Sequence, residues 1–246
     1  MPHMKKYSTL HKRLAVIYAI LMFSAIAMPA QQMTAEKILL TMKAAADRVK
    51  DYSAVLTASV QMERLKIPEM KVKVYFKQPD KIHIDSKGFS MLPRDGIFLN
   101  PSQFLNKFTA ELLSTEKKDG GTFYVIQLTP RADQQKNDRN RPPVSSKIWV
   151  DGNRWLVTKF ESTTQGGGSI SVEFRHGLVN GTYWLPEQIT ALFDVPQRKE
   201  ESQNEPGSRR QAMPRKGTIS MAYSCYQVNT GLPDELFEPK KGQKDK

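Results

Sequence analysis

The sequence predicts an α+β fold: a curled antiparallel sheet, or half-open β-barrel, covered by an N-terminal helix and a short inserted helical lid. One segment after residue 33 has helical periodicity, whereas most of the chain from residue 54 has apolar residues at alternate positions. Short turn sequences join many of the alternating segments, which favours antiparallel neighbours. A sheet of about eight or nine strands has to curl, and helices have to cover its concave apolar face.

The first thirty residues have the three parts of a cleavable secretory signal peptide. Four basic residues precede an apolar run from Leu14 to Ala27, and small and polar residues follow it. That run makes about 21 Å of helix, against roughly 30 Å of bilayer hydrocarbon, so a signal is favoured over a retained membrane anchor. Cleavage after Ala27 or after Ala30 is possible, and Ala30 is slightly favoured because polar residues begin directly after it. The sequence thus predicts export, with a signal over residues 1–30.

The net charge bears on the kind of partner that the protein binds, and the number of cysteines bears on its disulfides. The formal charge is +12, and without residues 1–30 the chain has 33 basic and 25 acidic residues, or +8. This balance favours lipid headgroups or a membrane surface as partners, although an ordinary solvated basic surface is also consistent with it. The sequence has no recognisable nucleic-acid-binding motif, so we expect no nucleic acid. Cys225 is the only cysteine and excludes an internal disulfide; we expect a buried, inert thiol on a strand face.

The expected helix begins after the N-cap Thr34 and ends near Asp51 and Tyr52. Alternating strands follow at 54–62, 70–76 and 82–84. Further strands are expected at 123–128, 147–150, 154–160, 170–174, 183–193 and 218–228. Asp151-Gly152-Asn153 and Asn180-Gly181 are strong hairpin turns.

A different segment interrupts the strands. Phe89 to Pro93 is apolar, and Pro101 to Leu113 has helical spacing, which predicts a short helix laid over the sheet. This segment is interpreted either as a lid that moves to admit a ligand or as a fixed covering helix. The residues assigned to it are Phe89, Met91, Leu92, Phe104 and Phe108. We expect loops at 130–143 and 196–215, one folded domain over 31–239, and a flexible tail over 240–246.

The order of several motifs resembles the outer-membrane lipoprotein carrier proteins (LolA) and their wider superfamily. A helix precedes a long first strand, and the stretch Val74 to Ile82 is similar to the family's strand, proline turn and strand. Lys147 to Glu161 is similar to the family's hairpin, and Tyr226 to Phe237 to its closing strand and Pro-Asp-x-x-Phe finish. The resemblance implies a periplasmic carrier that holds the acyl chains of lipoproteins or other lipids and shuttles them toward the outer membrane.

The resemblance further implies a monomer that works with an inner- or outer-membrane transport partner. Gln78, with Lys77 beside it, stands where the classical carriers have an arginine that holds the lid closed, which departs from the family's release mechanism. Envelope-stress sensors of the RseB type share the fold, so a sensor or adaptor that regulates a membrane partner through the same pocket is the alternative function.

The residues themselves favour binding over catalysis. The segment after the signal has only His83 and His176, without metal-ligand spacing, and it has no nucleophile-elbow serine. We therefore expect no enzyme activity, no metal and no cofactor. Small alanines and flexible methionines on the concave face favour an apolar cavity, with an ordinary packed core as the alternative. The predicted lining residues are Leu56, Ala58, Val60, Met62, Val72, Val74, Phe76, Ile82, Ile84, Met221 and Tyr223.

Overall fold

The computed structural model describes residues 33–62, 65–85, 101–118, 120–131, 145–163, 168–194 and 216–238. The predicted signal over 1–30, the tail over 240–246 and nearly all of the two predicted loops lie outside the described residues. Residues from Thr34 onward form one unit, and the description below concerns that unit.

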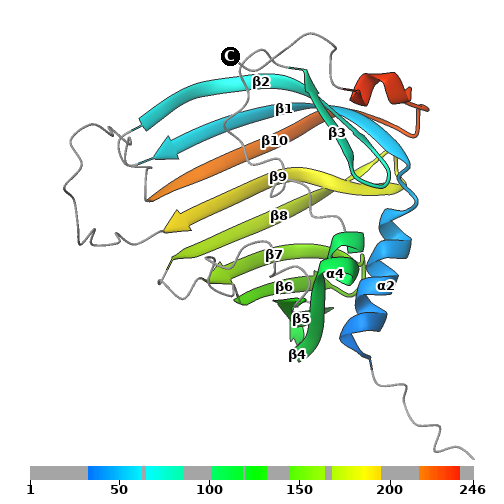
Figure 1. Ribbon diagram of the computed structural model, residues 1–246, viewed down its shortest axis with the longest axis vertical. Coiled ribbons are helices and arrows are strands. Elements are labelled where there is room, and N and C mark those ends of the chain that lie inside the picture. The colour runs from blue at the N-terminus through cyan, green and yellow to red at the C-terminus, as the bar shows by residue number, and fades with distance from the viewer. Residues whose placement is uncertain are drawn as a thin grey trace, which may run out of the picture. The chain divides into compact units, whose positions relative to one another are not determined.

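Ten antiparallel strands form one sheet in the order β3-β2-β1-β10-β9-β8-β7-β6-β5-β4. The edge strands β3 and β4 do not pair with each other, so the sheet curves without closing (Figure 1). The predicted half-open antiparallel sheet is confirmed. The strands are β1 (Asp51–Met62), β2 (Leu65–Lys77), β3 (Lys81–Asp85), β4 (Phe108–Lys118), β5 (Gly121–Pro130), β6 (Ser145–Asp151), β7 (Leu156–Thr163), β8 (Ser169–Val179), β9 (Tyr183–Asp194) and β10 (Lys216–Val228).

Helix α2 (Ala35–Ala46) crosses the end of the sheet at which β1 begins (Figure 1). The Thr34 side chain accepts a hydrogen bond from the backbone N–H of Lys37 at 3.2 Å, as the sequence predicts for an N-cap. The helix ends earlier than predicted, because Asp47 caps it and the backbone becomes extended before residue 51. Its apolar face buries Ile38, Leu39 and Met42 almost completely. Burial of this face, rather than helix propensity, stabilises so short a helix.

The inserted helix is shorter than predicted. Helix α4 (Pro101–Lys107) packs against α2, but the residues that follow it form strand β4 instead of continuing the helix to Leu113. Apolar residues at positions 108, 110 and 112 satisfy a period of two as well as a helical spacing, and pairing with β5 decides between them. Leu112 lies opposite Ile126 in that ladder. Strand β4 is the one strand of the sheet that was not expected from the sequence.

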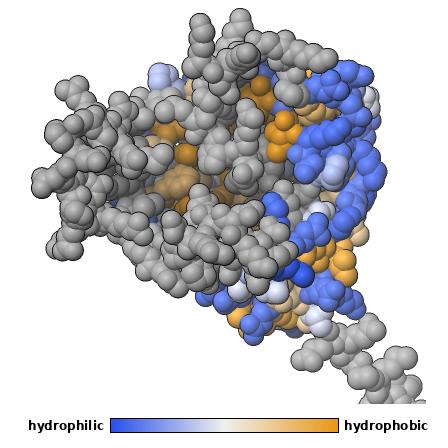
Figure 2. Space-filling model, viewed as in Figure 1, coloured by the Kyte–Doolittle hydropathy of each residue, from blue (hydrophilic) through white to orange (hydrophobic). Residues whose placement is uncertain are grey.

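The inner face of the sheet carries a continuous apolar cluster. Alternate residues of neighbouring strands meet on this face. Ala54 of β1 lies opposite Val74 of β2, and Met221 of β10 lies opposite Ile189 of β9. Figure 2 shows hydrophobic residues inside the curve of the sheet and hydrophilic residues along the side that carries α2. The buried members are Val49, Tyr52, Ala54, Leu56, Ala58, Val60, Val74, Val172, Leu185, Ile189, Ala191, Ile219, Met221 and Tyr223.

A β-bulge near the end of β10 overturns the prediction for Cys225. The residue has a φ of 53°, and the register shifts between Ser53 and Val55 of the partner strand. The extra residue reverses the alternation, so Cys225 is exposed and the next residue, Tyr226, packs against the apolar cluster. Strict alternation from Ile219 gave the wrong face because a bulge has no reliable sequence signal.

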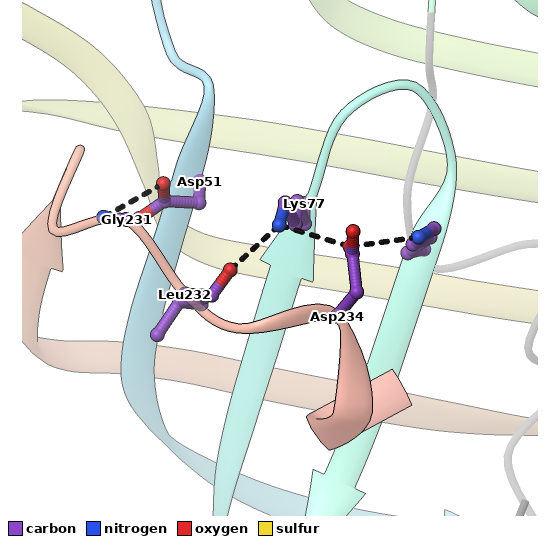
Figure 3. Close-up of polar contacts among 6 residues, drawn as sticks. Asp51, Lys77, Gly231, Leu232 and Asp234 are labelled. Atoms are coloured by element: carbon purple, nitrogen blue, oxygen red, sulfur yellow. Dashed lines mark hydrogen bonds and ion pairs between the residues drawn. The ribbon is translucent and has the colours of Figure 1, made fainter. Parts of the chain in front are cut away.

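The segment after β10 is bound to the start of β1 and to the β2–β3 turn (Figure 3). The buried carboxylate of Asp51 accepts hydrogen bonds from the backbone N–H groups of Thr230 and Gly231 at 2.9 and 3.0 Å. Lys77 donates to the Leu232 carbonyl at 2.7 Å. Lys81 and Lys77 also hydrogen-bond Asp234 of the 3-10 helix η1 (Asp234–Phe237) and lower the pKa of its carboxyl to about 2. Asp234, the aspartate of the Pro-Asp-x-x-Phe sequence, therefore attaches the segment after β10 to β2 and β3.

Candidate functional site

A pocket of about 200 Å³ lies between the carboxyl end of α2 and the adjacent end of the sheet. Its deep wall is apolar and buried, formed by Met42 and Val49 around α2, Tyr52 of β1 and Leu185 and Ile189 of β9. The other lining residues are Ala45, Ala46, Arg48, Phe76, Gln78, Pro101, Arg154, Trp155, Leu156, Val157, Phe174, His176, Thr182, Tyr183, Trp184 and Pro186. An apolar interior with a few polar groups is typical of small-ligand sites.

Of the predicted lining residues, Phe76 lines this pocket. Six others are buried in the apolar cluster: Leu56, Ala58, Val60, Val74, Met221 and Tyr223. Met62, Val72 and Ile84 are partly buried against it, and Ile82 pairs with Phe76 across β2 and β3. The pattern thus identified the concave face, and the pocket occupies the end of that face beneath α2. Contact of the remaining ten residues with a ligand stays a prediction.

Two of the predicted lid residues lie in described segments and contact each other. Phe104 of α4 is buried, and its ring meets the Phe108 ring edge-on at 6.4 Å between centroids. Pro101, at the start of α4, lines the pocket. Phe89, Met91 and Leu92 lie outside the described residues.

Gln78 joins the β2–β3 turn to the end of α2. Its side-chain amide donates hydrogen bonds to the carbonyls of Ala46 and Val49 at 3.4 and 3.2 Å. Its backbone N–H donates to the Lys50 carbonyl at 2.8 Å. Carbonyls at a helix end have no partner within the helix, so an amide donor here stabilises the docked helix. At the position where the classical carriers have an arginine, the neutral side chain of Gln78 therefore contacts the end of α2.

The sequence did not single out His176 as a site residue, yet it lines the pocket. The expected strand ended at Phe174, whereas β8 continues to Val179. The residue added by the register shift, Glu187, belongs to β9, so His176 lies on the same face of β8 as Val172 and Phe174. Burial, together with the nearby Arg154 cation, lowers the pKa of His176 to about 4, although Asp151 opposes the shift. His176 is therefore neutral at pH 7. The other histidine after the predicted signal, His83, lies beside Tyr75, with the two rings tilted at 43°, and does not line the pocket.

Stability is expected to fall on acidification because of His176. Between the unfolded pKa of 6.5 and the folded pKa of about 4, the unfolded chain binds a proton that the folded chain does not bind. The free energy of unfolding should therefore drop by about 3 kcal/mol across this window and level off below it. Urea unfolding of the native protein and of His176→Gln at pH 7, 6, 5 and 4 measures the difference. Equal pH dependence in the two proteins would contradict the assignment.

Three tyrosines lie next to the pocket wall. The ring of Tyr226 is 5.5 Å from that of Tyr52 and 6.3 Å from that of Tyr223. Burial raises the pKa of all three phenols above the usual value of 10. The Tyr226 hydroxyl donates to the Pro186 carbonyl at 2.6 Å, whereas the buried Tyr223 hydroxyl has no hydrogen-bond partner in the described structure. An unpaired buried hydroxyl costs about 1–3 kcal/mol.

No cluster of three or more His, Cys, Asp or Glu side chains suited to a metal ion occurs among the described residues. In the same part of the chain, the helices are too short or too polar to cross a bilayer.

Solved structures with similar folds are found, although sequence identity is low. A DUF1329 family protein from Desulfovibrio piger has a TM-score of 0.56 at 14% identity, covering 82% of this chain and 94% of that one. A LolA superfamily protein from Nitrosomonas europaea has a TM-score of 0.53 at 12% identity, covering 85% and 99%. A domain described as an outer membrane lipoprotein-sorting protein, from Vibrio parahaemolyticus, has a TM-score of 0.53 at 14% identity, covering 82% and 97%.

No family model matches the sequence, and no curated protein matches it. The structural likeness nevertheless shows that the chain has the LolA-like fold, as its motif order suggested.

Proposed function

We propose that this chain, which has the LolA-like fold, is an exported carrier that binds the acyl chains of lipoproteins or other lipids and moves them through the periplasm toward the outer membrane. The observation that carries the proposal is the apolar pocket beneath α2, whose wall shares Val49, Tyr52, Leu185 and Ile189 with the apolar cluster of the concave face. Burying an acyl chain there would contribute about 0.8 kcal/mol per methylene. If residues 1–30 act as a cleaved signal, the rest of the protein is exported to the periplasm. Residues 31–239 would then form one lipid-binding domain there.

The construction of the pocket supports non-catalytic binding. Its lining combines the end of α2 with the adjacent ends of the strands, and Gln78 hydrogen-bonds the end of α2 to the β2–β3 turn. Release of these hydrogen bonds would allow the end of α2 to move and admit a chain, with α4 packed against it. The predicted lid is thus proposed to include α2 as well as Phe104 and Phe108 of the inserted segment.

Filling the pocket tests the proposal. Ala45→Trp places an indole in the pocket, whereas Ala44→Trp places the same group on the exposed side of α2. We expect Ala45→Trp to weaken binding of a fluorescent fatty acid at least tenfold and Ala44→Trp to leave it unchanged. Titrations with both variants, after their melting temperatures have been compared, give the answer. Unchanged binding in the Ala45 variant would place the ligand elsewhere.

Mass spectrometry of the mature protein purified from its native envelope tests the cargo directly. We expect co-purified acylated molecules. Their absence, together with no uptake of the fluorescent fatty acid, would contradict the carrier.

A further inference from the structure

We propose that the mouth of the pocket binds the anionic group of a single-chain amphiphile, whose apolar chain enters the pocket. This inference rests on the proposed function and specifies the class of ligand. It follows from the charges, the pairing and the size of the site.

The charged groups that line the pocket are cationic. Arg48 and Arg154 line it, whereas none of the described lining residues is an aspartate or a glutamate. His176, also in the lining, is neutral at pH 7 and can donate a hydrogen bond without adding a charge. Among the described lining residues, an anionic group at the mouth therefore meets hydrogen-bond donors and positive charge.

The Arg48 guanidinium is available to a ligand. The residue follows α2 and is exposed, and its backbone carbonyl accepts a hydrogen bond from Asn229. Across the described parts of the chain, no carboxylate pairs with its guanidinium. The nearest acid in sequence, Asp47, pairs instead with Lys43.

Arg154 is held at the mouth by an aromatic ring. Its guanidinium carbon lies 4.3 Å from the centroid of Trp184, which is itself a lining residue. One guanidinium nitrogen contacts Asp151 at 3.3 Å, and the other Asp151 oxygen accepts the backbone N–H groups of Asn153 and Arg154. Because Asp151 is shared in this way, Arg154 keeps N–H donors for a carboxylate or phosphate.

The size of the pocket selects one chain. Its volume of about 200 Å³ is below the roughly 300–1,000 Å³ typical of sites for drug-sized ligands. A single acyl chain, or the end of one, fits such a space, whereas the two chains of a diacyl lipid do not enter together. The apolar deep wall then holds the chain while the arginines face the headgroup.

The test compares probes of equal chain length and different charge. Decanoate, decanol and decyltrimethylammonium are titrated into the native protein, with fluorescence of Trp155 and Trp184 as the readout because both line the pocket. We expect decanoate to bind at least tenfold more tightly than either other probe, and this preference to decrease as salt rises. Inorganic phosphate, which has the charge without the chain, should bind far more weakly.

Matched variants assign the preference to the arginines. Arg48→Gln combined with Arg154→Gln should remove the tenfold preference for decanoate over decanol. Arg175→Gln is the control, because Arg175 pairs with Glu187 outside this pocket. If the double variant is less stable, Arg48→Gln alone should still reduce the preference, since its guanidinium has no carboxylate partner among the described residues to lose.

The outcomes separate this inference from the carrier function. Equal binding of the three decyl probes to the native protein, or a preference that survives in both arginine variants, would overturn the anionic mouth while chain binding stands. Phosphate binding as tight as decanoate binding would also overturn it, because the site would then select a free anion. No binding of any decyl probe would overturn the proposed function together with this inference.

Discussion

Val74→Glu is expected to unfold the protein at pH 7. Val74 is completely buried between Ala54 of β1 and Ile84 of β3, and it does not line the pocket. A carboxylate there would be desolvated without a partner and would also remove the packing of valine, a loss of about 5 kcal/mol in the free energy of unfolding. This is comparable to the whole stability of many domains of this size.

The pH dependence identifies the cause of this loss. Burial raises the pKa of an introduced carboxyl in the folded state, so the destabilisation is greatest at neutral pH and decreases as the pH falls toward 4. Circular dichroism and urea unfolding from pH 7 to pH 4 measure both effects. Lys71→Glu, on the exposed face of the same strand, is the control and should change stability little. A Val74→Glu protein that folds with native stability and loses acyl binding would show that the ligand cavity extends past Val74.

Asp51→Ala is expected to destabilise the protein by about 4 kcal/mol. Its carboxylate accepts two backbone N–H groups and the Thr230 hydroxyl, the last at 3.3 Å. Hydrogen bonds to a charged group contribute about 1.5–3 kcal/mol each, and their loss leaves donors of the closing segment unpaired. The segment that carries Asp234 should then detach from Lys77 and Lys81 as well (Figure 3).

Thermal unfolding of Asp51→Ala, with Asp85→Ala as the control, measures this effect. Asp85 is exposed at the end of β3, so its replacement should shift the melting temperature little. Hydrogen exchange should show faster exchange at Thr230 and Gly231 in the Asp51 variant. Native stability and native exchange at these amides would show that the closing segment is held by other contacts.

The sequence allowed the sheet to be predicted better than the pocket. Alternation in β1 and β2 correctly indicated one apolar face, because a strand exposes its two faces with a strict period of two. The same rule failed at Cys225, where a bulge in β10 reverses the faces. Such a bulge depends on the partner strand, which the local sequence does not specify. His176 follows the alternation of Val172 and Phe174 and was missed because β8 runs past the expected end of the strand.

The local sequence pattern also could not predict the boundary between helix and strand near Phe108. Its spacing fits either structure, and the choice depends on pairing with β5 about twenty residues later in the chain. The pocket was missed for a related reason. Its lining comes from two helices, α2 and α4, from strands β1, β2, β7, β8 and β9, and from the turns beside them, so it exists only after the tertiary structure has formed.

The strand order has a consequence for the folding pathway. β1 pairs with β10, the last strand of the chain, in the interior of the sheet, and this pairing joins β1, β2 and β3 to the other seven strands. Contacts between residues so distant in sequence slow folding, because the chain must close a very long loop to form them. The sheet therefore cannot be completed until synthesis has passed Val228, and a nascent chain remains in two separate strand groups until its final strand emerges.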